Sequence, residues 1–373
     1  MSKHSKIMIV IGTKAELIKC LPVMWELQKK NLDYWFVHTG QHPVRESCRK
    51  FNVKEPDYLL SKEPKISTKF WSKVNKMSML WSLSMVFKVR RLVRKLRPKY
   101  VIYHGDTMST AAAAIGSSPL LNPMKSWNNV HLEAGLRSGS LFDPFPEEIS
   151  RQICDRFSDT LFAVSSKAVE NLKNKNSKKR IINTGNTIVD SALEIYGLAQ
   201  KDFSIKKPQG DYVLINSHRH ENIKSKKRME KIIEILESTT IKGIWPLHDN
   251  TEYWLKKHGL LERARNIKNI EIVPLTDYHT FMFLLANSKY LIMDGGSIQE
   301  ESLIFKKPCI IMRDRTERQE GLSSGINFLT GVDVKKAQKI IKKIESGEFK
   351  IPAYENPYGK RGLSKKIVEV LEK

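Results

Sequence analysis

The chain of 373 residues is longer than one ordinary hydrophobic core requires, so its length predicts two domains. A hydrophobic content of 40%, with 19 Gly and 15 Pro and no low-complexity tract or internal repeat, excludes a disordered or fibrous chain. The formal net charge of +24 is compatible with nucleic acid, with an anionic membrane surface, or with a lysine-rich composition that suits phosphate-bearing substrates, and we favour the last.

Cysteine usage and the lack of long apolar runs indicate where the chain acts. Cys20, Cys48, Cys154 and Cys309 are scattered and form no CxxC pair, which predicts a reducing compartment and no structural zinc. A short polar stretch leads directly into the strand-like Ile7–Ile11, which leaves no room for a signal sequence. No segment has the roughly 18 apolar residues that span a bilayer. We therefore expect a soluble, cytoplasmic protein.

Short β-branched runs alternate with helical patterns in the first half of the chain, and this alternation predicts βαβ units around a parallel sheet. The predicted elements are strand 7–12, helix Glu16–Lys29, strand 34–40, helix 78–96, strand 100–106, helix Ser109–Gly116, strand Val130–Glu133, helix 147–157 and strand 160–165.

Basic residues are densest in the segment 88–99, just after a run rich in Trp and Met. Val89, Leu92 and Val93 recur there at core-facing helical spacing, so we interpret the segment as an amphipathic helix that packs on the sheet and exposes a basic face. The alternative is a helix that lies on an anionic membrane. We expect no stable membrane insertion and at most a weak surface contact through residues 71–99.

The alternation restarts after residue 195, which predicts a second α/β domain. Its predicted elements are strand 212–219, helix 222–238, strand 242–248, helix 251–258, strand 269–275, helix 278–287, strand 290–296, helix 298–305 and strand 307–313. A terminal helix should cross back onto the first domain. We therefore predict one Rossmann-like domain of residues 1–190 with 358–373, and a second of residues 195–355.

Polar residues gather where the predicted strands end, which is where ligands bind in open parallel α/β sheets. Gly12 and Thr13 open a helix whose free amide groups can hold a phosphate or a carboxylate. Lys19 follows one turn later and faces either the cleft or solvent. Asp106 ends a strand and starts a helix, so it is either a helix cap or an acid or base in the crevice.

Charged residues are concentrated between residues 131 and 152. Glu133, Glu147 and Glu148 occur there with Arg137 and Arg151, in a segment too polar for simple packing. Several carboxylates near one cleft can hold different pKa values, so that one is protonated while another is a base. Arginines among them fix geometry and neutralise phosphate. The alternative is a surface network of salt bridges.

The predicted second domain has polar strand ends as well. His218 and His248 end two of its strands, which improves the case for functional rather than structural histidines. The small residues Gly295–Ser297 would let a diphosphate approach the backbone, and Glu301 is suitably placed for a ribose diol. Arg318 follows the next strand. This pattern predicts a site for a nucleotide diphosphate.

Taken together, the chain resembles the non-hydrolysing UDP-N-acetylglucosamine 2-epimerases in the order and spacing of the segments HGDT, EAGLRSG, PFPEEISR, TGNTIVD, HRHEN, DGGSIQEE and MRDRTERQEG. The resemblance implies a two-domain GT-B fold with the active site in the interdomain cleft, a UDP-sugar substrate, no cofactor, no metal and a homodimer. It also implies that UDP-N-acetylglucosamine, or a modified UDP-2-acetamido sugar, is interconverted with its C2 epimer by elimination and re-addition of UDP.

By the same resemblance, the acid and base positions are Asp106, Glu133, Glu147 and His218, without settling which carboxylate serves which face of C2. The implied substrate-binding residues are Lys14, Lys19, Arg137, Arg151, His248, Gly295, Gly296, Ser297, Glu301 and Arg318. The chain departs from the family pattern at Lys14-Ala15, at Gly295–Ser297 and at His220, where Arg-Pro, Ser-Gly-Gly and arginine are usual. These departures weaken the expectation about the exact sugar.

Three alternatives stay open. A hydrolysing 2-epimerase would release free N-acetylmannosamine and UDP, and the PFPEE segment favours the non-hydrolysing branch. The retained carboxylates argue against a sugar-transferring enzyme of the same fold. A basic membrane-surface or nucleic-acid-binding protein would explain the charge but has no use for carboxylates at the strand ends of both halves, so we expect no nucleic-acid partner.

Overall fold

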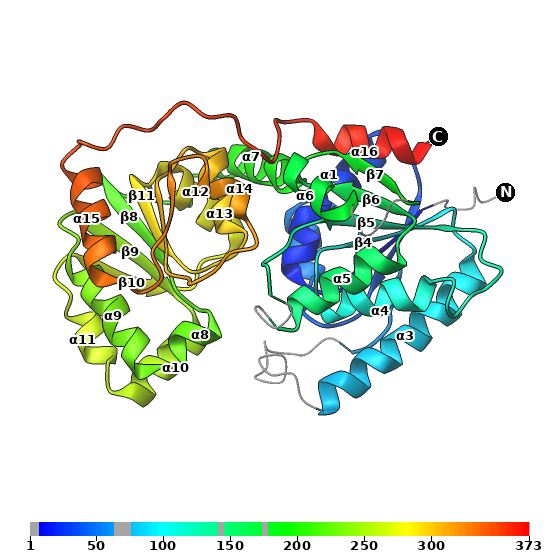
Figure 1. Cartoon of the computed structure of the whole chain (residues 1–373), viewed down its shortest axis with the longest axis horizontal. Helices are drawn as coiled ribbons and strands as arrows, with labels where there is room; N and C mark the ends of the chain where they lie inside the picture. Colours follow the sequence, from blue (N-terminus) through cyan, green and yellow to red (C-terminus); the bar gives the residue numbers. More distant parts are fainter. Residues whose placement is uncertain (1–6, 63–75, 141–144, 174–177, 373) are drawn as a thin grey trace. The chain divides into compact units, whose positions relative to one another are not determined.

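The computed structural model describes residues 7–62, 76–140, 145–173 and 178–372 (Figure 1). These residues form two compact units. The first unit comprises Met1–Ser191 with Tyr358–Lys373, and the second unit comprises Ala192–Pro357. The boundary falls within helix α7 (Ile188–Ala199).

The first unit is built on a seven-stranded sheet in the order β3-β2-β1-β4-β5-β6-β7, in which every neighbouring pair is parallel. Its strands are β1 (Ile7–Ile11), β2 (Tyr34–His38), β3 (Tyr58–Leu59), β4 (Tyr100–His104), β5 (Asn128–Ala134), β6 (Thr160–Ala163) and β7 (Arg180–Asn183). The five residues of β1 are all buried, as expected for a parallel strand covered on both faces.

Helices pack on this sheet in two groups (Figure 1): α3, α4 and α5 lie side by side, and α16 packs against α1. The helices are α1 (Lys14–Lys29), α2 (Arg45–Lys50), α3 (Lys76–Leu96), α4 (Met108–Ser117), α5 (Glu147–Phe157), α6 (Ser166–Lys173) and α16 (Leu363–Glu372).

The second unit is built on a six-stranded sheet in the order β10-β9-β8-β11-β12-β13, again entirely parallel. Its strands are β8 (Tyr212–Asn216), β9 (Lys242–Leu247), β10 (Ile270–Pro274), β11 (Tyr290–Met293), β12 (Cys309–Ile311) and β13 (Asn327–Leu329). Its helices are α8 (His220–Ile223), α9 (Lys226–Glu237), α10 (Asp249–His258), α11 (Leu261–Arg265), α12 (Tyr278–Asn287), α13 (Ile298–Ile304), α14 (Gln319–Leu322) and α15 (Val334–Glu345).

Both sheets reverse their strand order once, between β1 and β4 in the first unit and between β8 and β11 in the second. This is the order of doubly wound Rossmann-like sheets, so the predicted fold class is confirmed. In such sheets ligands bind beyond the carboxyl ends of the strands at the reversal. Ligand-binding residues are therefore expected directly after β1, β4, β8 and β11.

The predicted helix over 222–238 is wrong in one respect, because the structure has two helices, α8 and α9, in this region. The break falls at Ser225, whose side chain accepts a hydrogen bond from the backbone amide of Arg228 and caps α9. Serine competes for backbone groups in this way, so it favours a helix start over a helix interior.

The basic segment forms helix α3 from residue 76, and residues 71–75 lie outside the described part of the chain. Its core-facing side includes Val89 and Val93, which are fully buried, so the predicted packing on the unit is confirmed. Its outer side exposes Leu83 and Phe87. No helix among the described residues is long and apolar enough to cross a membrane.

Candidate active site

The turn after β1 is tied to the turn after β4 by a buried carboxylate, Glu16. Glu16 accepts the backbone amides of Gly12 and Thr13 at 2.6 and 2.8 Å, and Thr13 in turn caps α1. Its other oxygen accepts the hydroxyls of Thr107, at 2.5 Å, and Thr110. Burial raises the pKa of Glu16 above its ordinary value, although these hydrogen bonds oppose the shift. Glu16 therefore links the turn after β1 to the turn after β4 through hydrogen bonds.

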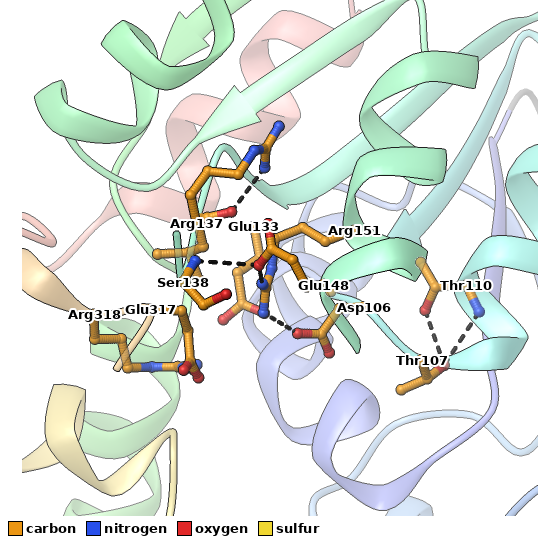
Figure 2. A network of polar contacts seen from close by, with 12 residues as sticks. Asp106, Thr107, Thr110, Glu133, Arg137, Ser138, Glu148, Arg151, Glu317 and Arg318 are labelled. Carbon is orange, nitrogen blue, oxygen red and sulfur yellow. Dashed lines mark hydrogen bonds and ion pairs between the residues drawn. The ribbon is translucent and has the colours of Figure 1, made fainter. Parts of the chain in front are cut away.

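Asp106 lies beyond β4 and is joined to a second carboxylate by one arginine. Arg151 of α5 donates to Asp106 through Nη2 and to Glu148 through Nη1 (Figure 2). The arginine and Glu148 are almost fully buried, whereas the Asp106 side chain keeps 26% of its exposure. The backbone amide of Ser138 also donates to Glu148. The planar guanidinium thus fixes one accessible carboxylate against one buried carboxylate.

Glu133 forms a second carboxylate–cation pair at the end of β5. Lys19 points into the unit rather than into solvent and donates to Glu133 Oε1, and both side chains are about 5% exposed. Asn186 donates to the same oxygen at 3.2 Å, and His104 Nδ1 lies 3.8 Å from the other. The backbone of Glu133 has φ of 67°, at an irregularity in the β5–β6 register. A non-glycine residue held in this region is a feature typical of functional sites.

Arg137 is directed onto a buried carboxylate of α5, Asp155. Its Nη2 donates to Asp155 at 2.5 Å, and its Nη1 donates to the carbonyl of Leu136 at 2.7 Å. The other oxygen of Asp155 lies 2.8 Å from Nδ1 of His131. The residues Glu148, Arg151 and Asp155 follow one another at helical spacing, so one face of α5 carries this whole set.

Glu147 is the first residue of α5 and follows the cis peptide bond Phe145–Pro146. Its side chain is half-buried, and its neighbour Glu148 contacts Arg151. Lys14, the first residue of α1, is exposed. The roles expected of Glu147 and Lys14 stay predictions.

In the second unit, Asp294 organises the turn after β8. Asp294 is fully buried at the end of β11 and accepts the backbone amides of His218 and Arg219, at 3.0 and 3.2 Å, and the Asn222 side chain at 2.9 Å. The His218 ring is thereby presented at the strand end, where its Nδ1 donates to Asn216.

The two predicted histidines come together in this unit. The ring of His248 stacks on that of His218, with 5.9 Å between centroids. Burial lowers the pKa of His248, and the neighbouring His218 adds to the effect. His248 Nδ1 accepts the backbone amide of Asn250, so its neutral form carries the proton on Nε2.

The segment after β11 approaches a buried ion network. A side chain at Gly296 would lie 3.1 Å from Arg318 Nη1, so only glycine fits there without a shift. Arg318 is paired with Glu317 (Figure 2), and its Nε lies 3.2 Å from Glu300. Glu301 is buried and accepts a hydrogen bond of 2.7 Å from the hydroxyl of Tyr278. Tyr278 thus orients the carboxylate that the sequence assigns to the ribose.

Sequence reasoning missed the groups that support these side chains. Thr13 and Glu16 follow the T-x-x-E spacing of a capping box, which is a signal that could have identified Glu16. His131 lies in β5 and Asp294 directly follows β11, and the partners of both are distant in sequence. Among the described residues, no group of three or more His, Cys, Asp and Glu side chains could hold a metal ion.

Comparison with known proteins places this geometry in a family. The family model described as UDP-N-acetylglucosamine 2-epimerase matches residues 26–372. The UDP-N-acetylglucosamine 2-epimerase of Methanocaldococcus jannaschii is 32% identical over 98% of each chain. The UDP-2,3-diacetamido-2,3-dideoxy-D-glucuronate 2-epimerase of Pseudomonas aeruginosa is 31% identical over 87% of this chain and 88% of its own.

The likeness extends to structure. A crystal structure of the M. jannaschii UDP-GlcNAc 2-epimerase in complex with UDP-GlcNAc and UDP superposes with a TM-score of 0.82 at 31% identity, covering 98% of this chain and 99% of that one. Because the family model spans nearly the whole chain, and full-length relatives share both its sequence and its fold, the chain belongs to the UDP-N-acetylglucosamine 2-epimerase family.

Proposed function

We propose that the chain interconverts UDP-N-acetylglucosamine, or a modified UDP-2-acetamido sugar, and its C2 epimer by elimination and re-addition of UDP. The observation that carries the proposal is the pair of carboxylate–cation sets at the carboxyl ends of neighbouring strands, Asp106 with Arg151 after β4 and Glu133 with Lys19 on β5. The names of the relatives support the same reaction.

The reaction needs a base, an acid and a site for the departing diphosphate. A carboxylate removes the C2 proton, the C1–O bond to UDP breaks, and 2-acetamidoglucal and UDP form. A proton then reaches the opposite face of C2, and UDP adds back to C1. Asp106, Glu133 and Glu147 are the carboxyl groups proposed for proton transfer at the sugar. Partly exposed Asp106 and buried Glu133 occupy different environments, as two groups with different roles require.

We propose that the second unit binds the uridine diphosphate. Gly295–Ser297 would admit the diphosphate to the backbone, and Glu301, oriented by Tyr278, would bind the ribose diol. His218, held by Asp294, would act at the sugar end of the same ligand. Arg318 and His248 remain proposed contacts of the nucleotide sugar.

The decisive experiment is incubation of the purified chain with UDP-N-acetylglucosamine in deuterated water. We expect the UDP-linked C2 epimer with deuterium at C2, together with trace UDP and 2-acetamidoglucal, because C2 is deprotonated and reprotonated. Free N-acetylmannosamine with UDP and no UDP-linked epimer would replace this proposal with the hydrolysing reaction. A parallel incubation with UDP-2,3-diacetamido-2,3-dideoxy-D-glucuronate, the sugar named for the Pseudomonas relative, tests the substituents at C3 and C6.

The carboxylate assignment is tested by Asp106→Asn and Glu147→Gln. Each variant keeps the shape of the side chain but loses charge and proton-transfer capacity, so turnover should fall by about a hundredfold or more. UDP binding should survive, as measured by calorimetry. Glu170→Gln, which neutralises an exposed carboxylate of α6, is the matched control and should leave turnover unchanged. Parental turnover in both test variants would remove these carboxylates from the reaction.

We also infer that the chain acts as a homodimer. The exposed apolar residues Met79, Leu80, Leu83 and Phe87 on α3 form a surface that a second copy would cover. Sedimentation equilibrium should give a dimer, and Leu83→Glu should shift it toward monomer. A parent that sediments as a monomer at micromolar concentration would contradict the inference.

The cysteines support a cytoplasmic site of action. All four are free thiols and are buried in the structure, as expected in a reducing compartment. Cell fractionation should recover the chain with cytoplasmic markers, and recovery with membranes would contradict this proposal.

A further inference from the structure

His131, in the middle of β5, is fully buried between two hydrogen-bond acceptors. Its Nδ1 lies 2.8 Å from Oδ1 of Asp155, and its Nε2 lies 2.8 Å from the carbonyl oxygen of Gly105. A neutral imidazole has one N–H and can therefore donate to only one of them. A carbonyl oxygen can only accept, so Nε2 must carry a proton. The protonation of Nδ1 depends on the state of Asp155.

Asp155 is an ionised acceptor. Its second oxygen receives a hydrogen bond of 2.5 Å from Arg137. Burial works to raise the pKa of Asp155, but its contacts to His131 and to the guanidinium of Arg137 outweigh burial and hold the pKa below its ordinary value. A carboxylate without a proton leaves Nδ1 of His131 as the donor. Both ring nitrogens are then protonated.

The second acceptor connects His131 to the turn that carries Asp106. The Gly105 carbonyl belongs to the peptide bond that leads into Asp106. The backbone amide of Gly105 donates to Leu132 on β5 at 3.0 Å, so both sides of this residue are held by β5. Gly105 has φ of 75°, a conformation that leaves the peptide plane dependent on these contacts.

We propose that His131 is held as an imidazolium and is a positioning residue that fixes the Gly105–Asp106 peptide, and with it the carboxylate of Asp106. The inference deepens the proposed function and rests on it only for the role of Asp106. A misplacement of a reacting group by about 1 Å can cost a hundredfold in rate. Loss of the hydrogen bond from His131 to Gly105 should therefore lower turnover more than it lowers nucleotide binding.

Other titratable groups lie close to His131 or to its partner Asp155. The Tyr103 ring lies 5.8 Å from the His131 ring, between centroids. Asp155 joins His131 to Arg137 through its carboxylate and to Lys179 through its backbone carbonyl. Burial raises the pKa of Tyr103 and of Cys154 well above their ordinary values, so both are neutral. Burial lowers the pKa of Lys179 to about 8, and its ammonium donates to the Asp155 carbonyl at 2.6 Å. Titration of Lys179 is therefore a separate source of pH dependence beside Asp155.

Two substitutions of His131 each remove one of its two hydrogen bonds and keep the other. His131→Asn keeps a donor near the position of Nδ1 and loses the donor to Gly105, whereas His131→Gln keeps a donor near Nε2 and loses the donor to Asp155. We expect kcat of His131→Asn to fall by about ten- to a hundredfold with unchanged UDP affinity, and His131→Gln to recover part of the loss. Equal kcat for His131→Asn and the parent, or no recovery in His131→Gln, would overturn the positioning role. His258→Gln in the second unit, where one ring nitrogen contacts the Ile223 carbonyl, is the control.

The protonation state of His131 can be measured independently of enzyme activity. Nitrogen NMR of histidine-labelled parent at neutral pH, with the His131 signal identified by its loss in His131→Asn, should show protons on both ring nitrogens. A single protonated nitrogen would overturn the imidazolium, whether or not the chain proves to be an epimerase.

Discussion

Glu133 combines a functional side chain with an unfavourable backbone conformation. Its φ of 67° costs a non-glycine residue about 1–2 kcal/mol, because Cβ approaches the carbonyl oxygen. Glycine has no such cost. We expect Glu133→Gly to be more stable than Glu133→Ala by about 1 kcal/mol, since both lose the contact to Lys19 and differ only in the backbone term.

Urea unfolding of the two Glu133 variants measures this difference, as a shift in the urea concentration at which half of the first unit is unfolded. Both variants should be inactive, so each serves as the other's control for the lost carboxylate. An alanine variant as stable as the glycine variant would show that the backbone at this position relaxes.

Asp155 contributes to the folding stability of the first unit, and this contribution is lost in acid. Its folded-state pKa is held below the ordinary value of 3.8, so its stabilising contribution is fully present above that value and is lost as the pH falls through the folded-state pKa. Asp155→Asn should therefore be less stable than the parent at neutral pH, and the difference should shrink below about pH 4. Thermal unfolding across pH measures the gap, and a gap independent of pH would contradict this linkage.

At the level of elements, the carboxylate of Asp190 fastens the start of α16 to the rest of the first unit. Asp190 accepts the backbone amides of Gly362 and Ser364, at 2.7 and 2.8 Å, and the Ser364 hydroxyl at 2.7 Å. Asp190→Ala should loosen α16 from α1 by about 3 kcal/mol, because hydrogen bonds to a charged group are strong.

Hydrogen exchange of residues 363–372 should report the loosening of α16 directly. Glu372→Gln, which removes only the partly exposed contact to Lys30, should leave exchange nearly unchanged. Protection of α16 in Asp190→Ala equal to that of the parent would show that apolar packing alone holds the helix.

The sequence predicts the long elements well and the short ones poorly. The helices expected over 147–157 and 278–287 coincide with α5 and α12, because α5 has a full amphipathic period and Asp277 caps the start of α12. Strands of two or three residues, such as β3 and β13, contain no alternation to detect. The strand-end position of Asp106 and His218 was visible in the sequence, since apolar runs stop there. Contacts such as Glu16 with Thr107, or His131 with Asp155, were not, because the partners are brought together only by the sheet.

At the scale of the whole molecule, nucleotide binding should stabilise the folded chain by mass action. UDP at a hundred times its dissociation constant should add about 2.7 kcal/mol, and Glu301→Ala should reduce this effect by weakening the ribose contact. The melting temperature with and without UDP measures it. Glu271→Ala, which removes an exposed carboxylate on β10, is the control. Equal stabilisation of Glu301→Ala and the parent would remove Glu301 from the nucleotide site.

The division of the first unit into two separated stretches has a consequence for biosynthesis. Residues 358–373 belong to the first unit, and α16 packs on α1, yet the ribosome makes the entire second unit between them. During synthesis of the second unit, the nascent first unit therefore still lacks α16. The apolar surface that α16 covers stays exposed to solvent for this time. The translation time of residues 192–357 sets how long that surface depends on chaperones, so slow codons in this stretch should lower the yield of folded protein.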